Sequence, residues 1–559
     1  MSTWPAPSAL DARTQAFPVL TEGQKNRIRA YSKVRQVHEG EILFEPGDTE
    51  VPFFVLQSGA MEIVQPYLAG ERPVTTHGPG SFTGEMTMIS GRRCLVRGRV
   101  TAAGEFLEMS AESLRTLVAR DAELSEILMR AFILRRLVLI NRGQGDVILM
   151  GSRHSASTLR LREFLSRNGH PYTYVDLDTD TDVQTLLDRF SIQASEIPVV
   201  ICNTRTVLRN PTIQEVTDCL GFNVSVDSGH LRDVVIVGGG PSGLAAAVYA
   251  ASEGLDALVI EPETPGGQAG SSSKIENYLG FPTGVSGQEL ASRAITQAMK
   301  FGAKIMVGHR VERLNCDRRP YQVYLDNGDA IATRSIIIAT GAQYNKPALH
   351  NLEQFEGQGI YYGATYIEAQ FCGGEEVVVV GGGNSAGQAA VYLAQTASKV
   401  NMLVRSDNLS DTMSRYLVQR IMENPAIELH YKTQITALDG NSRLEQVTWC
   451  NGGKNATTTR SISNLFIMAG ASPRTGWLQG CLALDNKGFV LTGRDLDPVL
   501  ADGAVLTWPL TRAPFMLETS LPCVFAVGDV RSGNVKRVAS AVGEGSIAVH
   551  LVHRALAET

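Results

Sequence analysis

The stretch DVVIVGGGPSGLAAAVYAASEGLDALVIE, residues 233–261, decides the fold of the largest part of this chain. An apolar run precedes the spacing G-x-G-x-x-G, and an alanine-rich run and a second apolar run ending in an acid follow it. This order predicts strand, glycine loop, helix and strand, as in a Rossmann-like dinucleotide-binding unit. Glycines let the backbone approach a pyrophosphate, the helix N-terminus favours its charge, and the acid accepts ribose hydroxyls. The predicted ligands are Gly238, Gly240, Gly243 and Glu261.

The same pattern occurs a second time in EEVVVVGGGNSAGQAAVYLAQTASKVNMLVR, residues 375–405. Here the third glycine is replaced by alanine, and the following strand ends at Arg405 instead of an acid. An arginine at that place can pair with a 2′-phosphate, which favours NADP and leaves NAD as the alternative. The predicted ligands are Gly381, Gly383, Asn384, Ser385, Ala386 and Arg405.

Two dinucleotide sites in one chain imply a flavin that takes hydride and a nicotinamide that supplies it. The segment FAVGDVRSGN, residues 525–534, places Asp529 after a strand, where it can bind the ribityl chain of a flavin. The segment ATGA, residues 339–342, marks another strand end close to the first glycine loop. FAD and NADP are therefore the predicted cofactors.

Residues 232–559 resemble the low-molecular-weight thioredoxin reductases and their relatives. The resemblance rests on GGQAGSSSKIENYLGFP (266–282), ATGA, the loop GGGNSA and the pair GD at 528–529. It implies a flavin domain in two pieces, 232–350 and 474–559, with the nicotinamide domain, 351–473, inserted between them. It also implies further FAD contacts from Gly267, Gln268, Asn277, Val311, Thr340, Gly341, Gly528, Val538 and Ala539.

The segment GIYYGATYIEAQF, residues 359–371, departs from that family. The family carries C-A-T-C-D here, whereas this chain has Gly363 and Tyr366 at the two cysteine positions and Ile367 at the acid. Dithiol exchange needs a thiolate and a proton donor, and these residues supply neither. We therefore expect an FAD-dependent oxidoreductase that passes hydride from NAD(P)H to an acceptor other than a dithiol. The alternatives are a redox-silent sensor of FAD and NAD(P), and a disulfide reductase that uses distant cysteines.

The eight cysteines are scattered, and no two of them form C-x-x-C. This spacing predicts neither a disulfide framework nor a zinc site, and the expectation is unpaired, buried thiols in a reducing cytosol. No metal site is predicted.

Residues 147–221 resemble a glutaredoxin-like thioredoxin fold. The run VILMGSRHSASTLRLREFLSRNGHPYTYVDLD, residues 147–178, predicts strand, loop, helix and strand, and Pro198 matches the loop proline that is usually cis. Where this fold normally presents C-x-x-C, the chain reads Ser152-Arg153-His154-Ser155. Serines cannot carry disulfide chemistry, so the expected module has no redox activity, and His154 is expected to be a surface residue at the helix start.

Residues 1–140 resemble a cyclic nucleotide-binding domain, a β-roll closed by helices from Ala111 onward. The pair Gly84–Glu85 matches the family's G-E, whose acid holds the ribose 2′-hydroxyl. The arginine that clamps the cyclic phosphate is replaced by Cys94, so Arg92 and Arg93 are the candidate substitutes. The effector is therefore a cyclic nucleotide or another small molecule, and a purely structural or docking role is the third possibility.

Length and composition agree with several globular domains. The chain has 559 residues, of which 19% are charged, and a net charge of −6, which does not favour nucleic acid or an anionic membrane surface. No apolar run is long enough to span a membrane, because Arg135 and Arg136 interrupt AFILRRLVLI, and no signal peptide is predicted. The expected protein is cytoplasmic, and the resemblance implies a homodimer. Its predicted architecture is a β-roll, an α/β thioredoxin-like domain and two Rossmann-like domains.

Overall fold

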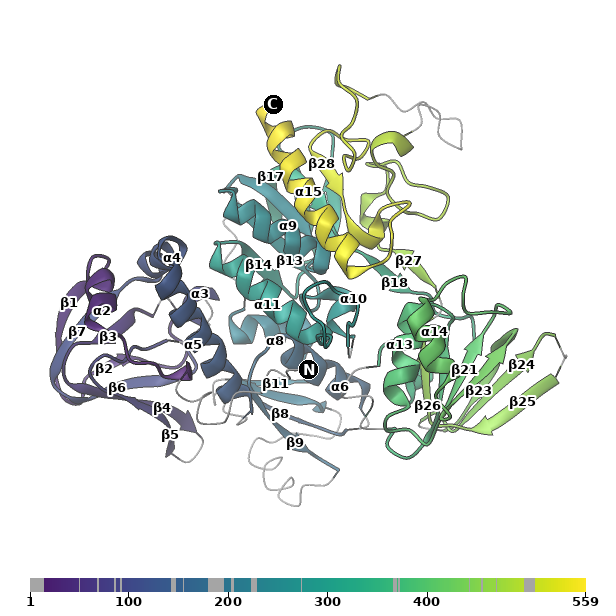
Figure 1. Cartoon of the computed structure of the whole chain (residues 1–559), viewed down its shortest axis with the longest axis horizontal. Helices are drawn as coiled ribbons and strands as arrows, with labels where there is room; N and C mark the ends of the chain where they lie inside the picture. The colour runs from purple at the N-terminus through teal and green to yellow at the C-terminus, as the bar shows by residue number, and fades with distance from the viewer. Residues whose placement is uncertain are drawn as a thin grey trace.

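The computed structural model describes residues 15–49, 51–67, 70–84, 87–90, 93–141, 147–153, 155–178, 196–202, 206–222, 229–272, 274–364, 369, 372–441, 443–453, 456–468, 470–496 and 508–558. Figure 1 shows the N-terminal β-roll at one end, in purple and blue. The sheet that begins at residue 232, with the C-terminal helix against it, lies in the centre. The domain of residues 360–467, which we call the green domain after its colour in the figure, lies at the other end.

The N-terminal part is a roll of two antiparallel sheets with strand orders β1-β7-β3 and β2-β6-β4-β5. Phenylalanines fill its core, including Phe53, Phe82 and Phe132, each fully buried. The helical run expected from Ala111 is two helices, because the Asp121 carboxylate accepts the Leu124 amide and so begins a new helix. The elements are β1 Lys33–Val37, β2 Ile42–Phe44, β3 Phe53–Leu56, β4 Ala60–Tyr67, β5 Gly70–His77, β6 Arg97–Ala102, β7 Gly104–Met109, α2 Glu22–Arg29, α3 Thr87–Ser90, α4 Ala111–Arg120 and α5 Ala122–Asn141.

The middle module, residues 147–222, is a four-stranded sheet with order β11-β10-β8-β9. Strands β8 and β9 are parallel, and β10 is antiparallel to both β8 and β11. The bond between Ile197 and Pro198 is cis, as the sequence predicts. The elements are β8 Val147–Gly151, α6 Ala156–Arg167, β9 Tyr172–Asp176, β10 Val199–Cys202, β11 Thr206–Arg209 and α8 Ile213–Leu220. His154 lies outside the described residues.

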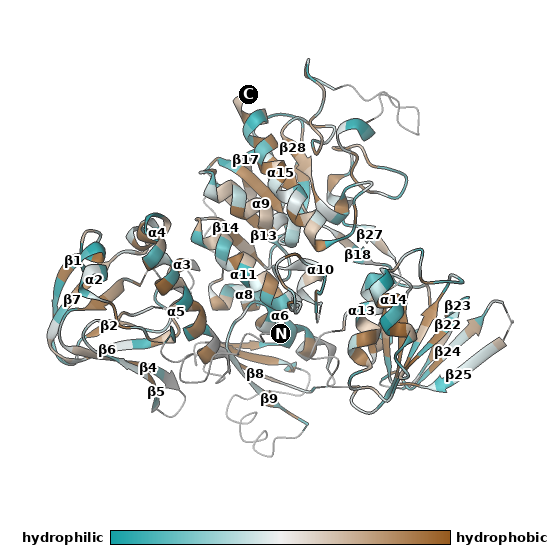
Figure 2. Cartoon of the chain, viewed as in Figure 1, coloured by the Kyte–Doolittle hydropathy of each residue, from teal (hydrophilic) through white to brown (hydrophobic). Residues whose placement is uncertain are grey.

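The central domain is built on the sheet β14-β13-β12-β17-β16-β15, with β28 paired to β17. Strands β12, β13, β14, β17 and β28 pair with one another in parallel, and β16 and β15 extend the sheet from β17 as antiparallel strands. Hydrophobic residues concentrate on these strands, as the brown colour of β28 shows (Figure 2). The elements are β12 Arg232–Val237, α9 Pro241–Ser252, β13 Ala257–Glu261, α10 Gly267–Gly270, α11 Gly287–Lys300, β14 Lys304–Val307, β15 Val311–Asn315, β16 Tyr321–Leu325, β17 Ala330–Ile338, β28 Val524–Ala526 and α15 Val538–Ala557.

The green domain contains the parallel sheet β19-β26-β20-β21-β22 and the antiparallel sheet β23-β24-β25. The antiparallel pair β18 and β27 joins it to the central domain. The elements are β18 Ala342–Tyr344, β19 Ile360–Tyr361, β20 Glu376–Val380, α13 Asn384–Leu393, β21 Lys399–Val404, α14 Arg415–Met422, β22 Ile427–Tyr431, β23 Thr433–Asp439, β24 Gln446–Asn451, β25 Ala456–Ser461, β26 Asn464–Ile467 and β27 Ala471–Pro473.

The expectation that all cysteines are unpaired is wrong for two of them. Cys316, just after β15, and Cys481, just after the short 3-10 helix Gly476–Leu478, form a disulfide with their Cα atoms 5.9 Å apart. The two cysteines are separated by 165 residues in the sequence. Both pack against the core of the central domain, and a rule based on local spacing does not detect such a long-range pair.

No helix among the described residues is long and apolar enough to cross a membrane. Within the same ranges, no group of three or more metal-ligating His, Cys, Asp or Glu side chains comes together.

Candidate dinucleotide-binding sites

The first glycine loop connects β12 to α9 at the carboxyl edge of the central sheet. Gly238 has a φ of +107°, and a Cβ there would lie 2.3 Å from the carbonyl oxygen of Ala339. A Cβ on Gly243 would lie 1.9 Å from the carbonyl oxygen of Gly238, so both positions need glycine for packing alone. Gly240 is different, because the nearest atom to its Cβ position is 4.0 Å away on Gly267. The space in front of Gly240 is therefore open, as a bound pyrophosphate requires.

The helix N-termini fall into two groups. Helices α2, α4, α6, α8 and α11 begin with Thr or Ser side chains that accept a backbone N–H. Helices α9, α13 and α15 begin at Gly240, Gly383 and Arg537 without a side-chain cap, and the shorter helices α10 and α14 also begin without one. The first amides of a helix need an acceptor, and an anion can serve. Both predicted glycine loops, and the start of α15 near the predicted flavin, thus offer donors that fit dinucleotides.

Glu261 is the last residue of β13, and its side chain contacts the first glycine loop. One carboxylate oxygen accepts the Gly239 amide at 2.7 Å, and the other accepts the Glu263 amide at 3.0 Å. Burial raises the pKa of this carboxyl group. The Gly308 amide donates to the Glu261 carbonyl, so the segment leading to Val311 starts at the same edge. The structure therefore places Glu261 where a ribose beside the loop could reach it.

Two other predicted FAD segments meet the first loop. The Gly266 amide donates to the Gly239 carbonyl at 2.7 Å. The side chain of Gln268 donates to the Ala342 carbonyl, which joins the GGQ segment to ATGA. Thr340 and Gly341 of ATGA bond the backbone of Arg474 at the domain junction. Asn277 instead lies exposed on the loop between Ile275 and Val285.

The C-terminal piece closes the site from the other side. A Cβ on Gly528 would lie 2.6 Å from the hydroxyl of Ser242, so the GD pair sits at the first turn of α9. Burial raises the pKa of Asp529, the next residue. Val538 and Ala539 are the first two residues of α15. Sequence segments almost 300 residues apart thus converge on one edge of the sheet.

The second loop connects β20 to α13. A Cβ on Gly381 would lie 2.5 Å from the Met468 carbonyl, whereas at Gly383 the nearest atom is 4.0 Å away. Ala386 is fully buried, and Ser385 is exposed. The side-chain oxygen of Asn384 accepts a hydrogen bond from the Ser414 amide at 2.8 Å. This loop repeats the open space and uncapped helix of the first one.

Arg405 lies exposed directly after β21. Its neighbour Val404 approaches the Cβ position of Gly382 to 3.1 Å, which places the strand end beside the second loop. Arg405 is therefore within the part of the domain where a second dinucleotide would carry its ribose phosphate.

Residues 232–545 match the family described as pyridine nucleotide-disulphide oxidoreductase. The chain belongs to this family. Residues 34–121 match the cyclic nucleotide-binding domain, so this oxidoreductase carries such a domain at its N-terminal side. Members of the oxidoreductase family, including the thioredoxin reductases, use FAD and NADPH.

Curated relatives cover the C-terminal part of this oxidoreductase. Thioredoxin reductase of Rickettsia felis is 32% identical over 326 residues, which are 58% of this chain and 97% of the relative. NADPH-dependent thioredoxin reductase 3 of Arabidopsis thaliana is 30% identical over 367 residues, covering 63% of this chain and 65% of the relative. The structure of Lactococcus lactis thioredoxin reductase superposes with a TM-score of 0.52 at 27% identity, covering 59% of this chain and 100% of that chain.

Gly363, which stands at the position of the family's first redox cysteine, lies next to one of the predicted FAD segments. The Cβ position of Gly363 is 3.8 Å from the side chain of Ser271, which follows the GGQ helix α10. Tyr366 and Ile367 lie outside the described residues. Cys372, farther along the same segment, is fully buried.

The cyclic nucleotide-binding domain contains a cavity of about 60 Å³. Gly84 and Cys94, singled out in the sequence, both line it, and Glu85 and Arg92 lie outside the described residues. Arg93 points elsewhere, because its guanidinium donates to the Cys219 carbonyl of the middle module at 3.2 Å. The remaining lining residues are Phe17, Phe44, Val51, Ile63, Val74, Thr75, His77, Met88, Val96, Arg135, Val138 and Leu139.

Two ionisable residues of this cavity, Arg135 and His77, were not predicted from the sequence. Arg135 donates to the carbonyls of Phe82 and Gly84 at 3.1 and 2.8 Å. Burial, and then the charge of Arg135, lower the pKa of His77 to about 3, so the imidazole is neutral at pH 7. The available signal for Arg135 was a pair of arginines inside the otherwise apolar run AFILRRLVLI, residues 131–140.

Proposed function

We propose that this chain is an FAD-dependent NAD(P)H oxidoreductase that delivers electrons to an acceptor other than a dithiol. The observation that carries the proposal is the pair of open, uncapped glycine loops, one beside the buried Glu261 and one beside Arg405. When bound together, the two cofactors supply hydride transfer from nicotinamide to flavin.

The chain's own residues bind and orient in this proposal. The amides at the start of α9 would donate hydrogen bonds to the FAD pyrophosphate, and Glu261 would accept hydrogen bonds from ribose hydroxyls. The start of α15 and Asp529 would hold the flavin end of FAD. The amides at the start of α13 bind the second pyrophosphate. The proposed FAD ligands are Gly238, Gly240, Gly243, Glu261, Gly267, Gln268, Asn277, Val311, Thr340, Gly341, Gly528, Asp529, Val538 and Ala539.

The electrons leave by a route without a dithiol. The full sequence contains no C-x-x-C, and Gly363 and Tyr366 stand at the positions that resemble the family's two cysteines. Gly363 lies beside Ser271, so this part of the chain faces the FAD segments without a thiol. The acceptor class is therefore distinct from protein disulfides.

The test is anaerobic mixing of the purified, FAD-loaded protein with NADPH, followed through the visible flavin absorbance. We expect the flavin to bleach, because both sites are present. A flavin that stays oxidised with both NADPH and NADH would contradict the enzyme proposal and support a redox-silent sensor.

Arg405 decides the choice between NADPH and NADH in this proposal. Arg405→Ala is expected to weaken NADPH binding about tenfold, because a charge-assisted hydrogen bond to the 2′-phosphate is lost. NADH binding should stay unchanged. The measurement is the dissociation constant of each nucleotide, with Arg460→Ala, an exposed arginine on β25, as the control. An equal loss for both nucleotides would contradict a phosphate contact.

The N-terminal parts serve as regulatory and docking modules in this proposal, with domain boundaries at 1–140, 147–221, 232–350, 351–473 and 474–559. The sheet order and the cis Pro198 support a thioredoxin-like fold for the middle module, and Ser152 and Ser155 stand where cysteines would be needed. The cavity lined by Gly84, His77 and Arg135 is the proposed effector site.

A further inference from the structure

The middle module contacts the segment that the proposed function assigns to FAD. Arg167 is the last residue of α6, and its guanidinium donates to the Gly267 carbonyl at 2.7 Å. The same nitrogen lies 3.2 Å from the Cβ position of Gly270. A second guanidinium nitrogen bonds Glu163 one turn earlier at 3.1 Å, which fixes the side chain along its helix. Arg167 thus lies against the whole short helix α10.

Two neighbouring contacts make this turn an interface. The Gln288 side chain of α11 donates to the Ser166 carbonyl at 2.9 Å. The side-chain amide of Asn168 donates to the hydroxyl of Thr264 at 3.4 Å, and Thr264 lies in the loop between Glu261 and α10. The turn at residues 166–169, which we name the docking turn, therefore holds the GGQ segment from outside the flavin domain.

The charge of Arg167 also acts on the site. Burial raises the pKa of Glu261, and the Arg167 cation is one of the influences that oppose this increase. The Arg167 cation favours the ionised form of the Glu261 carboxylate. In this form both carboxylate oxygens are acceptors, as hydrogen bonds from ribose hydroxyls require.

The other side of the docking turn is held by the N-terminal domain. Arg136 of α5 is buried, and its guanidinium donates to the Gly169 carbonyl at 2.9 Å. The preceding residue, Arg135, lines the proposed effector cavity and donates to Gly84. Adjacent arginines of one helix therefore contact the cavity and the docking turn.

We propose that Arg167 is a positioning residue for FAD, supplied by a module outside the family match, and that Arg136 holds the turn that carries it. This inference rests on the proposed function, because it assigns a role at the same FAD site. Arg167 acts through the Gly267 carbonyl, which fixes the backbone of Gly267 and Gln268. The N-terminal domain thereby influences how tightly the flavin is held.

The first test compares FAD dissociation constants of full-length variants after removal and titration of FAD. Arg167→Ala is expected to bind FAD about tenfold more weakly, and Arg167→Lys, which keeps the charge, to recover most of the affinity. Arg209→Ala, an exposed ion-pair arginine of the same module, is the control and should match the wild type. The visible spectrum of bound flavin should shift in Arg167→Ala, which a purely structural role of Arg167 within its own module would not cause.

The second test asks whether Arg136 acts through Arg167. Arg136→Ala is expected to weaken FAD binding about threefold, whereas Arg130→Ala, an exposed arginine of the same helix, should not. In an Arg167→Ala background, Arg136→Ala should have no further effect, because both changes release the same turn. If wild-type protein binds FAD and the Arg167 and Arg136 variants bind it equally well, this inference is overturned and the proposed function stands. A wild type that takes up no FAD would overturn both.

Discussion

Gly240→Ala is expected to weaken FAD binding about 100-fold while leaving the apoprotein as stable as the wild type. The added methyl group meets no protein atom closer than 4.0 Å, so the fold tolerates it. It occupies the space that the FAD pyrophosphate would take, and overpacking of this kind costs up to about 3 kcal/mol. The measurements are the FAD dissociation constant and the thermal midpoint of the apoprotein.

Gly383→Ala is the matched control, since its nearest atom is also 4.0 Å away. This variant should retain FAD with a normal affinity, yet bind NADPH poorly and bleach slowly. Retention of FAD by Gly240→Ala, or loss of FAD in Gly383→Ala, would show that the two sites have been assigned wrongly.

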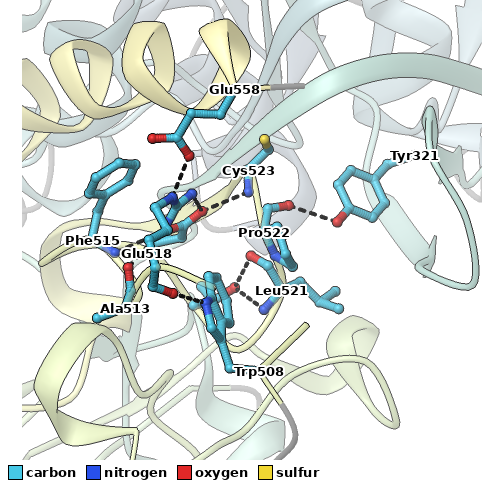
Figure 3. A network of polar contacts seen from close by, with 11 residues as sticks. Tyr321, Trp508, Ala513, Phe515, Glu518, Leu521, Pro522, Cys523 and Glu558 are labelled. Atoms are coloured by element: carbon cyan, nitrogen blue, oxygen red, sulfur yellow. Dashed lines mark hydrogen bonds and ion pairs between the residues drawn. The ribbon is translucent and has the colours of Figure 1, made fainter. Parts of the chain in front are cut away.

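Arg512→Ala is expected to destabilise the central domain by about 3–5 kcal/mol. Figure 3 shows the reason, a network around Glu518 beside β28. The fully buried Glu518 carboxylate accepts two bonds from the Arg512 guanidinium, at 2.6 and 3.0 Å, and one each from the amides of Phe515 and Cys523 at 2.9 Å. Without Arg512, a buried carboxylate keeps only backbone partners.

The free energy of unfolding of this variant can be followed by urea titration of tryptophan fluorescence, because the Trp508 indole donates to the Arg512 carbonyl. Arg334→Ala removes an exposed ion pair with Asp233 in the same domain and should change stability by less than about 1 kcal/mol. The combined change Arg512→Met and Glu518→Leu should recover part of the loss. Equal stability of Arg512→Ala and Arg334→Ala would contradict a structural role for the buried pair.

The dinucleotide loops were predictable because their chemistry is local. Each loop needs glycines at fixed spacing, an apolar run before them and a helix after them, and all three features lie within about 30 residues. The structure adds the reason, since Gly238 and Gly243 leave no room for a Cβ and Gly240 leaves open space. Strand β21 was predicted in the same way, and the structure ends it at Val404, one residue before Arg405.

The features that the sequence did not reveal depend on long-range packing. Cys316 and Cys481 meet because β15 and the segment after Leu478 share one core. Arg135 lines a cavity together with residues from strands of the β-roll and from helix α3. Arg167 donates to the carbonyl of Gly267, which lies 100 residues later in the sequence and belongs to another module. No periodicity or spacing rule reports contacts of this kind.

The number of electrons that the protein accepts distinguishes a flavin that acts alone from one that passes electrons to a disulfide. Anaerobic titration of the FAD-loaded protein with NADPH should reach its end point at one equivalent per flavin, because FAD takes one hydride and no dithiol follows it. Thioredoxin added afterwards should remain oxidised. Uptake of a second equivalent, abolished in Cys481→Ala or by alkylation of the protein after reduction of its disulfide, would show instead that a disulfide takes electrons from the flavin.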